Sequence, residues 1–153
     1  MTRSVSMLYS LSALVLVACC SSAFAFQLIT EDEAKLPDDL YDDVRGGPFP
    51  GPRITIYGAQ NEMMSPIALT IELKAFGGAS INPNSLQMFY QKKPKVNLLP
   101  RVRNFINVQR DSVVMQIENA EIPVGHHQIL FKVEDTRGHF SEKPWRFSIV
   151  RER

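Results

Sequence analysis

The sequence of 153 residues predicts an all-β sandwich of about seven strands with one short helical segment, on three observations. Apolar and polar residues alternate with a period of two in six runs between residues 54 and 149, which is typical of half-buried strands. Turn-forming residues such as Gly77-Gly78 and Asn82-Pro83-Asn84 separate these runs. Because each strand has one apolar face, a second sheet is needed to cover it, and this favours two packed sheets.

The six alternating runs are residues 54–57, 69–75, 86–91, 113–118, 128–133 and 145–149. Only residues 98–108 break the alternation. Val102, Phe105 and Ile106 have the i, i+3, i+4 spacing of a helix, and Pro100 would stand in its first turn, where proline is tolerated. We therefore expect a short helical segment there and strands elsewhere in residues 53–153.

The first 25 residues have the three parts of a signal peptide. Arg3 gives a positive start, residues 8–18 form an apolar run that is too short for a membrane span, and Ala23-Phe24-Ala25 is a cleavage site. This predicts a periplasmic or secreted bacterial protein with no transmembrane span in its mature form. As an alternative, Leu16-Val17-Ala18-Cys19 resembles a lipobox, and cleavage before a lipidated Cys19 would give a membrane-anchored lipoprotein.

The near-neutral total charge of +1 hides two oppositely charged parts. Residues 31–43 hold seven acidic side chains against Lys35 alone, whereas the chain from residue 44 onward has nine acidic and 15 basic side chains. Glycine and proline fill six of the seven positions 46–52, as in a linker. We expect residues 26–52 to be an acidic, Gly/Pro-rich disordered leader. The alternative is a segment that docks on the basic domain or on a partner.

The strongest basic cluster is the candidate partner-binding surface of the domain. Few aromatic residues are interleaved with it, and a nucleic-acid platform would need them, so we expect a protein or an anionic envelope polymer as partner. Its candidate residues are Lys92, Lys93, Lys95, Arg101 and Arg103.

Four segments resemble, in order and spacing, the motifs of bacterial immunoglobulin-like domains. They are Ile81-Asn82-Pro83-Asn84-Ser85-Leu86, Pro123-Val124-Gly125-His126-His127, Val133-Glu134-Asp135-Thr136-Arg137-Gly138 and Trp145-Arg146-Phe147-Ser148-Ile149. The resemblance covers about residues 53–151. It implies an immunoglobulin-like or fibronectin-III-like β-sandwich that acts as a binding, spacer or adhesion domain without a cofactor.

A metal site is the competing hypothesis. Methionine and histidine in an exported sandwich resemble the periplasmic copper carriers, because thioethers suit Cu(I) and imidazoles suit Cu(II). The candidate ligands are His126, His127, His139, Met63 and Met64, and their other interpretation is as ordinary polar or loop residues.

Catalytic motifs are missing from the sequence. It contains no G-x-S-x-G, no glycine-rich phosphate loop and no H-E-x-x-H. We therefore expect a non-enzymatic, exported module that binds a protein or an envelope polymer. A periplasmic copper carrier is the alternative. A small hydrolase stays as a third hypothesis, because a Ser/His/Asp triad is a spatial arrangement.

Overall fold

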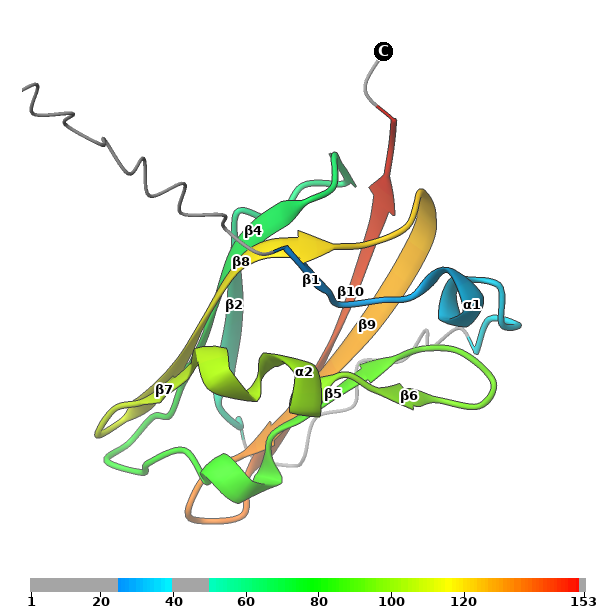
Figure 1. Ribbon diagram of the computed structural model, residues 1–153. Coiled ribbons are helices and arrows are strands. Elements are labelled where there is room, and N and C mark those ends of the chain that lie inside the picture. Colours follow the sequence, from blue (N-terminus) through cyan, green and yellow to red (C-terminus); the bar gives the residue numbers. More distant parts are fainter. Residues whose placement is uncertain (1–24, 40–49, 152–153) are drawn as a thin grey trace, which may run out of the picture.

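The computed structural model describes residues 25–39 and 50–151, which form two mixed sheets packed against each other (Figure 1). In the first sheet the order is β1 (Phe26–Gln27), β8 (Ser112–Glu121), β4 (Ile67–Lys74) and β2 (Arg53–Tyr57), and β7 (Ile106–Val108) also pairs with β8. In the second sheet it is β3 (Glu62–Met63), β10 (Phe140–Ile149), β9 (Gly125–Glu134), β5 (Gln87–Tyr90) and β6 (Val96–Asn97). The all-β sandwich is confirmed.

Most neighbouring strands are antiparallel, and only the two-residue strands β1 and β3 run parallel to their partners. Each of the six predicted runs contains a strand. The described residues hold ten strands, against the predicted number of about seven, and β1, β3 and β6 have only two residues each. Such short pairings carry no alternating pattern long enough to be seen in the sequence.

The core lies between the two sheets and follows the period-two pattern. Ile71 and Met115 of the first sheet and Met88 and Phe131 of the second are fully buried. The only tryptophan, Trp145, lies at the core with 7% exposure, and its ring stacks on another aromatic ring of β10.

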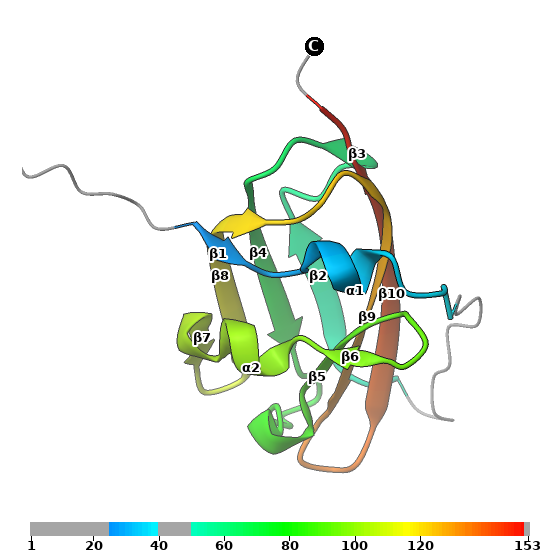
Figure 2. The same cartoon turned by 45° about the vertical axis from the view of Figure 1, so that its right-hand side comes forward.

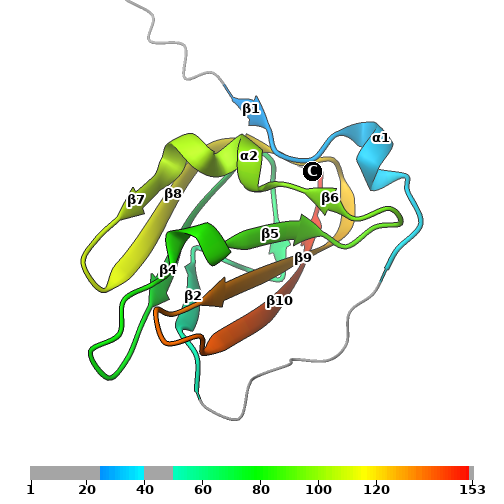
Figure 3. The ribbon, with the colours of Figure 1, turned by 90° about the horizontal axis from the view of Figure 1, so that it is seen from below.

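The predicted helical segment is present in part. Residues Leu99–Val102 form α2, with Pro100 in its first turn, and Arg103–Phe105 form the 3-10 turn η2. Ile106–Val108 leave the helical path and pair with β8 as strand β7, because cross-strand pairing outweighs the helical spacing there. Seen from below, α2 lies over one open side of the sandwich, between β7 and β6 (Figure 3). A second 3-10 turn, η1, spans Pro83–Ser85.

Residues 26–39 differ from the predicted disordered leader. They form β1 and the helix α1 (Glu31–Ala34), and they run along one side of the sandwich beside α2 and β6 (Figure 2). Leu28 and Ile29 are fully buried, and both of their amides donate to the Glu121 carbonyl. Burying each of these side chains stabilises the fold by about 1.5–3 kcal/mol, which outweighs the tendency of an acidic segment to stay solvated.

The rest of the predicted leader up to residue 49, the predicted signal peptide up to residue 24 and the lipidation candidate Cys19 lie outside the described residues. Within the part of the chain that the structure describes, no helix has the length and apolar character needed to cross a membrane.

Candidate functional site

The basic cluster predicted to bind a partner lies against the acidic N-terminal segment. Arg101 of α2 donates from Nη1 to Glu33 Oε2 at 2.8 Å and from Nη2 to Glu33 Oε1 at 2.5 Å. Its Nη1 also donates to the Leu28 carbonyl at 2.7 Å. The hydrogen bonds from Arg101 lower the pKa of Glu33 from 4.5 to about 2, and those to Glu33 raise the pKa of Arg101.

Glu33 is held in place by the start of its own helix. Thr30 caps α1 with its hydroxyl oxygen, which accepts from the Glu33 amide, and the Glu33 carboxylate accepts from the Thr30 amide. This reciprocal pair is a capping box, so the same carboxylate caps the N-terminus of α1 and binds Arg101 of α2.

Lys92 is a buried cation that the N-terminal segment neutralises. Lys92 is 5% exposed, and its Nζ donates to Asp38 Oδ1 at 2.6 Å and to the Ala34 carbonyl at 2.9 Å. A backbone hydrogen bond holds the same segment in place, since the Asp39 amide donates to the Gln91 carbonyl. A buried lysine without such a partner would be strongly destabilising.

The two remaining lysines of the cluster contact one aspartate at the surface. Lys93 and Lys95 place their Nζ atoms 3.5 Å and 3.8 Å from carboxylate oxygens of Asp39. Four of the five predicted partner-binding cations therefore already have an acidic partner within the chain. Arg103 is the exception: it is exposed, and none of the described acidic side chains forms an ion pair with it.

A groove lies over the open end of the β9–β10 hairpin, where β9 begins and β10 ends, and we call it the β9–β10 groove. Its volume is about 350 Å³. The described residues that line it come from the N-terminal segment, the turn before β3 and both strands of the hairpin; they are Asp38, Asn61, His126, His127, Gln128, Arg146, Phe147 and Ser148.

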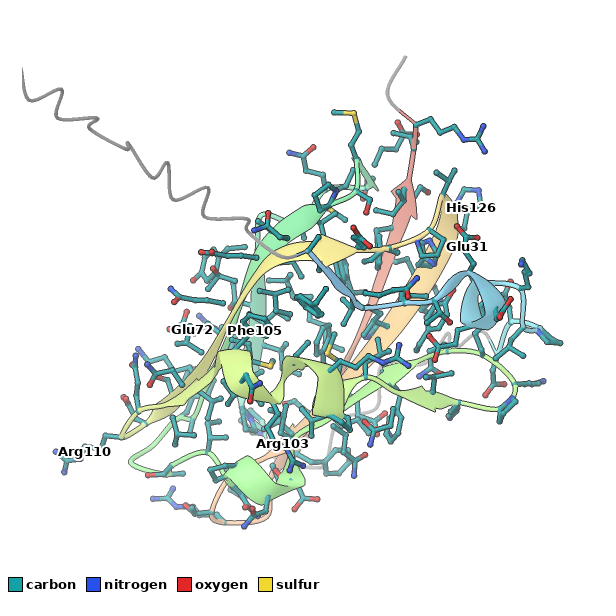
Figure 4. All side chains as sticks on the ribbon, in the orientation of Figure 1. Glu31, Glu72, Arg103, Phe105, Arg110 and His126 are labelled. Carbon is teal, nitrogen blue, oxygen red and sulfur yellow. The ribbon has the colours of Figure 1, made fainter. Side chains whose placement is uncertain are left out.

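Strand register places His126 beside Ser148 in this groove. The two residues stand opposite each other in the antiparallel ladder, and His126 Nδ1 and Ser148 Oγ are 2.8 Å apart. Ser148 also donates its amide to the Asn61 carbonyl, which fixes the loop before β3 against the hairpin. His126 therefore lies at an accessible position on the upper edge of the molecule (Figure 4).

His127 has a structural position. It is 4% exposed, its Nδ1 is 2.9 Å from the Tyr90 hydroxyl and its Nε2 is 2.8 Å from the Pro123 carbonyl. Burial lowers the pKa of His127 and raises that of Tyr90. Both ring nitrogens are thus used within the fold.

The structure does not bring all of the candidate metal ligands to one place. His126 is at the start of β9, whereas His139 follows its end, where it contacts Asp135. Met63 packs against the core, and Met64 is 56% exposed. Among the described residues, no three His, Cys, Asp or Glu side chains are grouped as a metal site would need.

The sequence pattern did not indicate several residues of the groove and of the ion pairs. Asn61 and Arg146 come from separate segments and have no common spacing that would link them. Glu33 was detectable, because Thr30-Glu31-Asp32-Glu33 has the T-x-x-E pattern of a capping box directly after the apolar pair Leu28-Ile29.

Comparison of the chain with protein-family models, with curated proteins and with solved structures finds no match in any of the three.

Proposed function

We propose that this chain is a non-enzymatic, immunoglobulin-like module exported to the bacterial envelope, and that it binds a protein or an envelope polymer through the β9–β10 groove. The observation that carries this proposal is the convergence on one groove of polar side chains from three separate parts of the chain, namely Asp38, Asn61 and the hairpin residues His126 and Arg146.

The occupied basic cluster supports the choice of this groove. A partner bound at Lys92 or Arg101 would first have to displace Asp38 or Glu33, and with it the buried residues of the same segment. The β9–β10 groove requires no such displacement, because Asp38 lines it while it remains bound to Lys92.

Both hydrogen-bond donors and acceptors line the groove. Arg146 donates only, Asp38 accepts only, and Asn61 does both. A partner with regularly repeated donors and acceptors, such as a peptide backbone or the hydroxyl groups of a polysaccharide, is the class of ligand that such a lining fits. The open end of a sandwich is also where domains of this architecture present their variable loops.

Site-specific cross-linking in living bacteria tests this proposal. A photoreactive amino acid is placed at the exposed position Asn61 in the groove, and in a matched variant at the exposed position Gln116, on β8 of the other sheet. We expect cross-linked product from position 61 and none from position 116, with equal melting temperatures for the two variants.

Equal cross-linking from both positions, or none from position 61 in any envelope fraction, would refute binding in the groove. Mass spectrometry of the product identifies the partner as a protein or as a polymer, and cell fractionation of the same culture tests export.

A further inference from the structure

A second pocket lies on another side of the sandwich, between the helical segment α2–η2, the turn η1 and strand β8. Its volume is about 400 Å³, within the range of about 300–1,000 Å³ that small-molecule sites occupy. Its lining is Pro83, Asn84, Leu86, Leu99, Arg103, Ile106 and Val113. None of these residues lines the β9–β10 groove, so this pocket is independent of the proposed function.

The inner wall of this pocket is apolar. Leu86, which directly precedes β5, and Val113 of β8 line it as buried core residues of 4% and 0% exposure. Leu99 and Ile106 are only partly buried and pack against the same core from the side. Strand β7 has three residues, so it covers little of the space between the sheets here. The apolar surface that a bound chain would cover is therefore that of the partly exposed Leu99 and Ile106.

One cation lies beside this apolar wall. Arg103 follows α2 directly, and its exposed side chain extends toward η1 (Figure 4). The neighbouring Arg101 is bound to Glu33, whereas none of the described acidic side chains pairs with Arg103. A guanidinium group at the edge of a pocket binds a carboxylate with two parallel hydrogen bonds. The charge of the pocket is thus suited to one anionic group.

We propose that this pocket binds a small amphipathic carboxylate, of the medium-chain fatty acid class, with its apolar chain against Leu99 and Ile106 and its carboxylate on Arg103. The lining does not fit a nucleotide, because it has no aromatic side chain for a base to stack on and only one cation for several phosphates. The exposed Asn84 of η1 provides a second donor for the same carboxylate.

Titration of the full chain with octanoate at neutral pH, followed by methyl NMR, tests the proposal. We expect saturable shifts of the methyl groups of Leu86, Leu99, Ile106 and Val113. Acetate, which lacks the chain, and 1-octanol, which lacks the charge, should each bind at least about tenfold more weakly.

Two matched variants assign the charge to its residue. Arg103→Gln should weaken octanoate binding by about tenfold, whereas Arg110→Gln, at an exposed arginine outside the pocket, should leave it unchanged. The proposal is overturned if octanoate shifts methyl groups elsewhere or none at all. Equal binding of octanol, equal effects of the two variants, or binding of an acidic peptide in place of octanoate overturns it too.

Discussion

Arg101 and Glu33 stand 68 residues apart in the sequence, and two hydrogen bonds join their side chains into an ion pair that fixes α1 against α2. Both side chains are mostly buried, with exposures of 29% and 18%. A pair of this geometry is stronger than an exposed ion pair, because less water screens it. The acidic N-terminal segment is therefore a part of the folded domain, and its charge is used inside the chain.

Acid should weaken the domain through Glu33. Its pKa is lowered to about 2 in the folded chain, so the unfolded chain takes up the proton first, near 4.5. The stabilisation is thus complete above about pH 4.5 and is lost as the pH falls toward 2. Between about pH 4.5 and 2, the free energy of unfolding should therefore fall by about 1–2 kcal/mol less in Glu33→Gln than in the unchanged chain. Urea unfolding across that pH range measures the difference. An unchanged pH dependence in the variant would contradict this assignment.

His127 should make the domain lose stability on acidification too, beginning at a higher pH than for Glu33. Burial lowers its pKa below the ordinary 6.5, so at mildly acidic pH the unfolded chain binds a proton that the folded chain excludes. Stability is then lost progressively as the pH falls below about 6.5. Imidazole NMR should show His127 still neutral where the unfolded chain is already protonated. Titration of His127 at or above 6.5 in the folded chain would show that burial does not control it.

The β9–β10 turn depends on the Asp135 carboxylate. Its Oδ1 accepts from the amides of Arg137 and His139 at 2.8 and 2.9 Å, and its Oδ2 is 3.1 Å from His139 Nδ1. Burial alone would raise the pKa of Asp135, but these donors lower it overall. We expect Asp135→Ala to reduce the free energy of unfolding by about 2 kcal/mol and Asp135→Asn by less, since the amide keeps one acceptor. Equal losses from both variants would contradict this role.

Replacing the buried Gln91 with an apolar side chain should make the domain more stable. It is 1% exposed, and among the described residues neither its Oε1 nor its Nε2 has a hydrogen-bond partner. Replacing it with leucine removes two unsatisfied buried polar atoms at similar volume. We expect Gln91→Leu to raise the free energy of unfolding by about 1 kcal/mol in urea unfolding. A loss of stability would show that the amide has a role that these contacts do not explain.

Local chemistry made much of the fold predictable. The alternating runs give the long strands, because a period of two on a covered sheet leaves few other solutions. The turn at Asp135 and Gly138 was also predictable: the carboxylate bonds nearby amides, and Gly138 has a φ of +81°, as expected for glycine there.

Long-range contacts explain what the sequence pattern missed. Counting charges over residues 31–43 favoured a disordered leader, but the order of this segment comes from burial of Leu28 and Ile29 and from Arg101, which lies far along the chain. Ile106 had helical spacing, yet pairing with Met115 of β8 draws it into a strand. The β9–β10 groove joins separate segments, so no local spacing could indicate it.

The central claim, that the acidic segment is a structural part of the domain, is tested most directly by a double-mutant cycle on Glu33→Gln and Arg101→Gln. We expect a coupling free energy of about 1–2 kcal/mol in urea unfolding at neutral pH. The matched control is the pair Asp32 and Lys35, whose carboxylate and ammonium are 3.4 Å apart with side chains 97% and 70% exposed, and its coupling should be near zero. Coupling between Glu33 and Arg101 no larger than in the control would contradict the account.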